Sequence, residues 1–256
     1  MLNIQAVPAF NDNYIWLIQS PNSQHTIIVD PGEAKPVIRR LSEQHLKPVA
    51  ILITHQCHDH VDGINTLIER YDIPVYGPDK ENIPCLTHPL VATKRLTIND
   101  HFTPIEVIDT PGHTAGHIVF YLDNVLFSGD TLFGAGCGRI HNGTAEQLFY
   151  SLQQLADLPP QTKIYCAHEY TEANLVFAQT VEPNNIDIQQ RIKDTLILRQ
   201  RNLPSIPSTL TLELATNPFL RCDQKEVIQA VQSFSGRTLI TAVEVFTELR
   251  KWKDQF

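Results

Sequence analysis

Short runs of β-branched, aliphatic and aromatic residues, separated by turn residues, dominate the first two-thirds of the chain. Runs of about four to eight such residues between turn signals are typical of strands. Between two of these runs, Asp123 and Asn124 form the kind of two-residue connection that predicts a tight hairpin. The expected strands are residues 4–7, 14–18, 26–29, 49–53, 75–76, 105–108, 118–122, 125–127 and 164–165.

Longer segments with apolar residues at helical spacing fill the last third of the chain. An earlier segment, residues 35–45, shows similar spacing through Val37 and Leu41 and is also expected to be a helix. The change of pattern predicts an α/β domain over residues 1–170 and a small helical domain over residues 171–256. The expected helices of the second domain are residues 171–181, 186–202, 225–234 and 241–253.

The composition narrows the class of protein. The 256 residues are 42% hydrophobic and 19% charged, which is typical of a globular protein with a proper core. A formal net charge of −8 argues against nucleic acid or an anionic membrane as the partner. The absence of a signal peptide and of any apolar run near roughly 18 residues, together with an odd number of cysteines, predicts a soluble cytoplasmic protein with reduced thiols. Small, buried hydrophobic roles are expected for Cys85, Cys137, Cys166 and Cys222.

Potential metal ligands follow directly after the strand expected at residues 49–53. Imidazole, thiolate and carboxylate groups are what zinc and its neighbours in the first transition row bind. Alternate residues of an extended segment point the same way. The first three candidates are therefore expected to share one side, and the fourth to follow at a turn. These candidates are, in order, His55, Cys57, Asp59 and His60.

Three further apolar runs also end in potential ligands, namely His113, Asp130 and His168. Sites in α/β folds form where strand ends converge, so the four strand ends are expected to share one sheet edge. A zinc ion usually has about four ligands, so seven candidates are too many for one ion but suit two. Asp130 follows a strand of its own and is the natural carboxylate bridge between two ions.

These residue types also have ordinary structural roles. An isolated histidine usually serves in the core or on the surface, a role we expect for His25, His45, His88 and His101. Ligand residues at four independent strand ends are much harder to explain by chance. The glycine-rich segment 134–138 lacks the Lys-Ser/Thr of a phosphate loop, so we expect it to allow close backbone approach near the metals.

Three segments carry motifs that resemble the metallo-β-lactamase fold superfamily. Residues 54–60 read Thr-His-x-x-x-Asp-His, residues 110–117 read Thr-Pro-Gly-His-Thr-Ala-Gly-His, and residues 127–133 read Phe-Ser-Gly-Asp-Thr-Leu-Phe. The resemblance implies an α/β fold, the αββα sandwich of this superfamily.

More specific motifs narrow the resemblance to glyoxalase II, the hydroxyacylglutathione hydrolases. They read Gly-Cys-Gly-Arg at 136–139, Cys-Ala-His-Glu-Tyr-Thr at 166–171, Asn-Pro-Phe-Leu-Arg at 217–221 and Lys-Asp-Gln-Phe at 253–256. The similarity runs nearly end to end. It implies a small helical C-terminal domain that helps to hold glutathione, and hydrolysis of S-(2-hydroxyacyl)glutathione, typically S-D-lactoylglutathione, by a metal-bound hydroxide in methylglyoxal detoxification.

The resemblance also implies a dinuclear site and a set of substrate contacts. The metals are typically zinc, with iron or manganese as alternatives, and the substrate is a small glutathione thioester bound by a monomer. Asp59 would orient the nucleophile as well as bind metal. The first ion would be bound by His55, position 57, His113 and Asp130, and the second by Asp59, His60, His168 and Asp130. The implied glutathione contacts are Arg139, His141, Tyr170, Arg250 and Lys253.

Cys57 departs from the family pattern, which has histidine at this position. His58 is not expected to replace it, because alternation points His58 away from His55 and Asp59. Three outcomes stay open: Cys57 binds metal, a water replaces it, or the first metal is weakly held. The alternatives to the hydrolase are a metal-binding pseudoenzyme or weakened paralogue, and another hydrolase or a dioxygenase of the same fold.

Overall fold

The computed structural model describes residues 2–91 and 95–256, and the chain forms two compact units. The first unit comprises the chain up to Asp109 together with Gly116–Gly129. The second comprises Thr110–Ala115 and Asp130–Phe256. A domain boundary at residue 170, as expected from the sequence pattern, stays a prediction.

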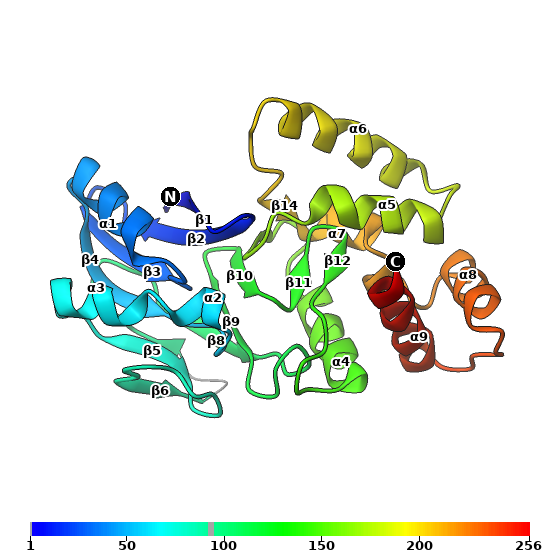
Figure 1. Ribbon diagram of the computed structural model, residues 1–256, viewed down its shortest axis with the longest axis horizontal. Helices are drawn as coiled ribbons and strands as arrows, with labels where there is room; N and C mark the ends of the chain where they lie inside the picture. Colours follow the sequence, from blue (N-terminus) through cyan, green and yellow to red (C-terminus); the bar gives the residue numbers. More distant parts are fainter. Residues whose placement is uncertain (1, 92–94) are drawn as a thin grey trace. The chain divides into compact units, whose positions relative to one another are not determined.

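A six-stranded sheet in strand order β1 to β6 forms one layer of the first unit (Figure 1). Its first three strands run antiparallel, whereas β3 to β6 pair in parallel. Parallel neighbours need crossover connections, and helices lie in two of these three: α1 (Ala34–Glu43) between β3 and β4, and α3 (Ile64–Tyr71) between β4 and β5. The strands are β1 (Asn3–Ala9), β2 (Asn13–Gln19), β3 (His25–Val29), β4 (Lys47–Leu52), β5 (Val75–Pro78) and β6 (His88–Leu90).

The crossover helices bury their apolar stripes against this sheet. Val37 and Leu41 of α1 and Leu67 of α3 lie in the same core cluster as Ile28 and Ile51 of the central strands. All five side chains are at most 1% exposed. This packing fixes β4, the strand that leads into the first group of potential ligands.

The first unit also contains an antiparallel run of four strands in the order β7 to β10. The turn between β9 and β10 is the predicted hairpin, in which Asp123 and Asn124 have φ angles of 49° and 60°. Two consecutive positive φ angles are those of a type I′ turn, which matches the twist of the flanking strands. The strands are β7 (Arg95–Leu96), β8 (Ile105–Asp109), β9 (Ile118–Leu122) and β10 (Val125–Gly129).

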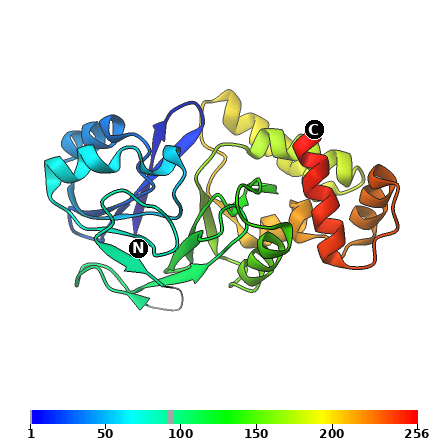
Figure 2. The same ribbon diagram turned by 60° about the horizontal axis from the view of Figure 1, so that its bottom comes forward.

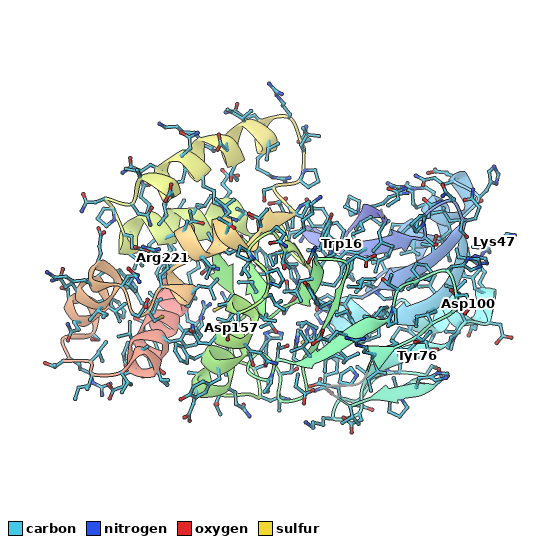
Figure 3. All side chains as sticks on the ribbon, turned by 180° about the vertical axis from the view of Figure 1, so that it is seen from behind. Trp16, Lys47, Tyr76, Asp100, Asp157 and Arg221 are labelled. Atoms are coloured by element: carbon cyan, nitrogen blue, oxygen red, sulfur yellow. The ribbon has the colours of Figure 1, made fainter. Side chains whose placement is uncertain are left out.

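Helices dominate the second unit, and α8 and α9 run beside one another in Figure 2. Thr144 and Thr241 begin α4 and α9 with capping boxes, which satisfy the first backbone N–H groups of each helix. Arg221, labelled in Figure 3, joins two segments by a bidentate pair with Glu182. The elements are β11 (Leu132–Phe133), β12 (Gly136–Cys137), α4 (Ala145–Ala156), β13 (Lys163–Cys166), α5 (Thr171–Val181), α6 (Ile186–Gln200), β14 (Ser208–Thr209), α7 (Leu210–Thr216), a 3₁₀ turn (Pro218–Leu220), α8 (Lys225–Ser235) and α9 (Ala242–Gln255).

A buried carboxylate, Glu213 of α7, connects several parts of the second unit. It accepts hydrogen bonds from the Arg191 guanidinium of α6 at 2.5 Å and from the backbone N–H of Ala135 at 2.8 Å. The Ser208 hydroxyl and the Asn217 amide also donate to it. Because Ala135 lies in the turn between β11 and β12, Glu213 holds the glycine-rich hairpin on the helices.

The expected strands and helices are confirmed. The expectation that residues 134–138 form a simple loop is replaced by the β11–β12 hairpin. Across residues 2–91 and 95–256, no helix combines the length and the apolar character needed to cross a membrane.

Candidate metal centre

The first ligand group follows β4 and is partly helical. Backbone at Cys57 is extended, with φ −60° and ψ 141°, and α2 (His58–Val61) begins immediately after it. Asp59 and His60 are therefore helical, so the expectation of an extended segment through Asp59 is wrong. The prediction that His58 points away is confirmed for a different reason: α2 leaves its side chain 80% exposed.

Asp30, at the end of β3, orients the buried side chains of this group. Its carboxylate accepts hydrogen bonds from the Thr54 backbone N–H at 2.8 Å and from the Thr54 hydroxyl at 2.7 Å. Its Oδ2 also lies 3.1 Å from Nδ1 of His60. A carboxylate beside one ring nitrogen leaves the other nitrogen available, as is usual for metal-binding histidines. The second nitrogen, Nε2, lies 3.6 Å from Oδ2 of Asp59.

Asp59 is held from two further sides. The Asn13 amide, in β2, donates a hydrogen bond of 3.0 Å to its Oδ2. The turn at Gly32 packs so closely on α2 that a Cβ at this position would lie 1.9 Å from the Asp59 carbonyl oxygen. Sequence reasoning missed Asn13 and Asp30 as supporting residues, and it noted Thr54 only as part of the motif at residues 54–60. The only signal was Asp30-Pro31-Gly32, which indicates a turn and nothing about metal ligands.

Replacing Asn13 with alanine is expected to lower metal affinity by about 10- to 100-fold, the usual effect of losing a supporting hydrogen bond to a metal ligand. Metal titration of the purified protein checks this. The matched control is Asn3→Ala in β1, because the Asn3 amide donates an exposed hydrogen bond to Gln19. If Asn13→Ala behaves like the control, Asn13 does not position Asp59.

The second unit contributes His113, Asp130 and His168. Oδ2 of Asp130 lies 3.6 Å from Nε2 of His113, and Oδ1 lies 3.4 Å from Nε2 of His168. Two donors bound at about 2.1 Å to one tetrahedral ion lie about 3.4 Å apart, which is longer than an ordinary hydrogen bond. Both Asp130 oxygens therefore have the spacing of a carboxylate that shares an ion with each neighbouring histidine.

The backbone also packs closely around His113. Its Nδ1 lies 2.7 Å from the Arg139 carbonyl oxygen, which leaves Nε2 for a metal. A Cβ at Gly138 would lie 2.0 Å from the Asp130 carbonyl oxygen and 3.1 Å from that same Nδ1. The close approach expected of the glycine-rich segment is thus present at Gly138.

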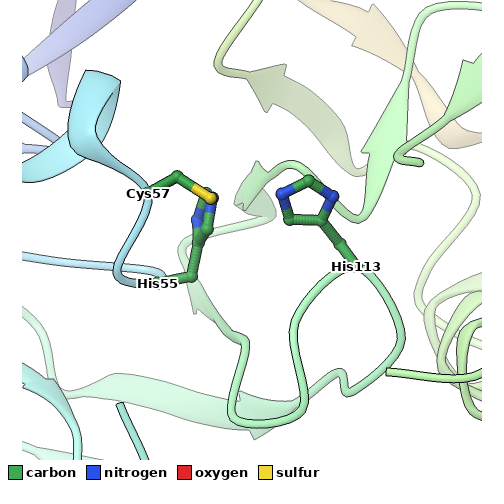
Figure 4. Close-up of side chains that lie close together, drawn as sticks. All are labelled: His55, Cys57 and His113. Carbon is green, nitrogen blue, oxygen red and sulfur yellow. The ribbon is translucent and has the colours of Figure 1, made fainter. Parts of the chain in front are cut away.

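Three groups of side chains offer ligand atoms that lie within 4.8 Å of one another. Figure 4 shows one of them, with the Cys57 sulfur beside the His55 ring and His113 turned toward both. Imidazole, thiolate and carboxylate donors in such groups fit divalent transition metals. The groups are His55, Cys57 and His113; His55, His60 and Asp130; and Asp59, His60 and His168.

All seven ligand candidates thus occur in these groups, and their role as ligands stays a prediction. The expectation that the four strand ends share one sheet edge is wrong, because β4 belongs to the first sheet while β8 and β10 belong to the second.

The candidate glutathione contacts all lie in the second unit. The Tyr170 ring stacks on the His168 ring with centroids 4.7 Å apart. His141 packs edge-on against the His113 ring and donates its backbone N–H to the His113 carbonyl oxygen. Arg139 is mostly exposed, with Nε 4.0 Å from Asp254. These residues place polar and aromatic groups beside two of the candidate ligands.

Arg250 and Lys253 of α9 differ from one another in exposure. Arg250 is only 4% exposed, although it lies near the end of a charged helix. Its guanidinium donates to the Cys137 carbonyl oxygen at 3.0 Å and to Asp254 at 2.9 Å. Burial lowers the pKa of Lys253, and the charges of Arg250 and Arg139 lower it further. A cluster of cations that repel one another is a favourable place for a bound anion.

Of the four cysteines outside the ligand groups, three are buried and one is exposed. Burial raises the pKa of Cys137 to about 11 and that of Cys166 to about 12, and it raises the pKa of Cys222 as well. Their expected roles as buried hydrophobic residues are confirmed. For Cys85 that expectation is wrong: its thiol is exposed and donates to Asn65.

Comparisons with known proteins identify the family. Residues 9–168 match the Metallo-beta-lactamase superfamily, and residues 169–256 match Hydroxyacylglutathione hydrolase C-terminus. The chain is similar over its whole length to the hydroxyacylglutathione hydrolase of Nitrosomonas europaea, with 48% identity and 97% of that protein covered. The chain belongs to the hydroxyacylglutathione hydrolase family. A second member, from Aliivibrio salmonicida, is 49% identical with both chains covered completely.

A solved structure of the same fold supports the architecture. ETHE1 from Myxococcus xanthus is similar with a TM-score of 0.68, covering 98% of this chain and 90% of that one at 21% identity. The likeness shows a shared fold alone. With the helical C-terminal part, this confirms the expected fold class, and the fold implies binding of divalent metal. This hydroxyacylglutathione hydrolase is therefore an enzyme whose candidate ligand groups fit the metals that its fold implies.

Proposed function

We propose that this enzyme hydrolyses the thioester of S-(2-hydroxyacyl)glutathione, typically S-D-lactoylglutathione, to glutathione and a 2-hydroxy acid. The main observation behind this proposal is the set of three His/Cys/Asp groups, within each of which the ligand atoms lie within 4.8 Å of one another. Full-length relatives named hydroxyacylglutathione hydrolase support the substrate. Through this substrate the enzyme would serve methylglyoxal detoxification.

We further propose two divalent ions per chain, zinc in the first instance, with iron or manganese as alternatives. The seven proposed ligands are His55, Cys57, Asp59, His60, His113, Asp130 and His168. When bound, such ions acidify water and act as Lewis acids toward a carbonyl oxygen. The remaining steps depend on side chains of the protein.

Asp59 is the proposed catalytic carboxylate. Asn13 occupies its Oδ2 with a 3.0 Å hydrogen bond, which fixes the plane of the carboxylate. Asp59 can then accept a hydrogen bond from the attacking water and direct the oxygen lone pair toward the thioester carbon. The leaving thiolate of glutathione has a conjugate acid with a pKa near 8.5, that of an ordinary cysteine, so it departs without a dedicated general acid.

The cations and aromatic rings of the second unit are the proposed glutathione contacts. Glutathione carries two carboxylates, and Arg139 and Lys253 offer charges beside them. Arg250 stabilises the backbone of this region by donating a hydrogen bond to the Cys137 carbonyl oxygen. Tyr170 and His141 would complete the contacts, and both pack on candidate metal-ligand rings. A carboxylate bound here would offset both effects that lower the pKa of Lys253, namely burial and, second, the charges of Arg250 and Arg139.

Replacing Lys253 with alanine is expected to raise KM for S-D-lactoylglutathione by about tenfold or more, because a charged hydrogen bond contributes about 1.5–3 kcal/mol. The value of kcat should change little, since Lys253 would bind the glutathione part in ground and transition states alike. The matched control is Lys251→Ala, which removes a neighbouring exposed lysine bonded to Glu248. A lactoyl thioester of a thiol without carboxylates should show no such difference. Equal KM values for both variants would refute the assignment.

We also propose that the enzyme is a monomer in the cytoplasm. The odd number of cysteines favours a reducing compartment. The curated relatives favour hydrolysis over the alternatives of a pseudoenzyme or a dioxygenase of the same fold. A dioxygenase would consume oxygen with its substrate, so an oxygen electrode separates that activity from hydrolysis.

A further inference from the structure

Cys57 differs from the other cysteines in its surroundings. Its sulfur belongs to a group with His55 and His113 whose ligand atoms lie within 4.8 Å of one another (Figure 4). Both histidines are buried, whereas Cys57 is of intermediate exposure. Two imidazoles and one thiol in this spacing form three-quarters of a tetrahedral metal site.

The local backbone places the side chain of residue 57, and not that of residue 58, in the group with His55 and His113. Cys57 is the last extended residue before α2, and its sulfur joins His55 in the ligand group. The next residue, His58, is 80% exposed, and its Nδ1 lies 3.6 Å from Oδ1 of Asp59. An imidazole is thus present one residue later, but it faces solvent instead of His55 and His113.

We propose that Cys57 binds the first metal as a thiolate and makes the position formed with His55 and His113 selective for zinc over manganese. The inference rests on the proposed function only for the presence of the metals. Thiolate is a soft donor that favours zinc, whereas manganese prefers carboxylate, carbonyl and water oxygens. The other position, formed with Asp59, His60 and His168, has only nitrogen and oxygen donors and lacks the added preference for zinc that a thiolate gives.

Thiolate also changes the charge of the first position. It adds one negative charge where a neutral imidazole would add none, and a sulfur donor lies about 0.2–0.3 Å farther from zinc than a nitrogen. A more electron-rich ion acidifies its water less strongly. The two positions of this enzyme are therefore chemically unequal, with the softer one marked by Cys57.

X-ray absorption at the zinc edge tests the assignment directly. Wild type, Cys57→Ser, Cys57→His and the control Cys85→Ser are each loaded with zinc. Wild type and Cys85→Ser should require a sulfur neighbour at about 2.3 Å, and both Cys57 variants should lack it. Zinc bound without a sulfur neighbour in wild type overturns the proposal, as does a sulfur neighbour that persists in Cys57→Ser.

Two further measurements use the same proteins. In competition with manganese, the preference for zinc should fall by about tenfold or more in Cys57→His, since one soft ligand is exchanged for imidazole. Zinc should also slow alkylation of Cys57 in wild type while leaving the exposed Cys85 unprotected. An unchanged preference, or equal alkylation with and without zinc, contradicts the proposal.

Hydrolysis of S-D-lactoylglutathione, measured on the same samples, separates this inference from the proposed function. A sulfur neighbour without hydrolysis supports the thiolate ligand and refutes the thioesterase. Hydrolysis with two bound ions and no sulfur neighbour supports the thioesterase and refutes the thiolate ligand.

Discussion

Replacing Asp130 with asparagine is expected to lower kcat/KM for S-D-lactoylglutathione by about three orders of magnitude, with loss of bound metal. Its two oxygens lie 3.6 Å and 3.4 Å from the Nε2 atoms of His113 and His168. An amide offers only one oxygen and no charge, so it cannot serve both neighbours. Lewis-acid stabilisation contributes several kcal/mol, and each 1.36 kcal/mol changes the rate tenfold.

The matched control is Asp109→Asn. Asp109 also ends a strand of the first unit, but its side chain is partly exposed and pairs with Lys80 at 3.4 Å. This variant should keep its metal content and its activity. Full activity and two bound metals in Asp130→Asn would show that Asp130 is not the shared ligand.

Replacing Glu213 with alanine is expected to lower the free energy of unfolding by about 3–5 kcal/mol. Glu213 is fully buried, and its partner Arg191 is 4% exposed. Removing one member of a buried ion pair leaves the other charge without compensation in a low-dielectric interior. The Ala135 backbone N–H would also lose its acceptor. Urea denaturation of the metal-loaded protein measures the change.

Glu226→Ala is the control, because Glu226 on α8 forms only exposed hydrogen bonds with Asn184. Its expected effect is below about 1 kcal/mol, as for surface substitutions in general. The double variant Arg191→Met with Glu213→Leu should recover part of the loss, since it removes both buried charges. A single variant Glu213→Ala as stable as wild type would contradict the described role of Glu213.

Several elements were predictable from their local pattern, but α4, whose capping box begins at Thr144, was not among the expected helices. Val37 and Leu41 gave the helical spacing that α1 shows, and Asp123-Asn124 gave a hairpin whose positive φ angles match a type I′ turn. The ligand candidates were predictable because His and Asp residues follow several strands, and the structure gathers all seven in three groups.

The supporting residues were not predictable, because their partners are far away in the sequence. Asn13 bonds Asp59 across 46 positions, and Asp30 bonds Thr54 across 24. A single Asn or Asp in a strand or turn carries no signal of such contacts. The start of α2 at His58 was also missed, since the short segment has no helical periodicity.

Arg250 shows the same limit in the second unit. Near the end of a charged helix its sequence context indicates a solvated cation, yet the folded chain buries it over the Phe219 ring and under the Cys137 carbonyl. Tertiary contacts determine whether such a side chain is buried, and the local charge pattern does not predict these contacts.

The most direct test of a two-metal thioesterase is to remove and restore the metal while following hydrolysis of S-D-lactoylglutathione. Chelation should abolish turnover, and added zinc should restore it as binding approaches two equivalents per chain. Full turnover in the metal-free protein, or two bound equivalents without turnover, would contradict the account.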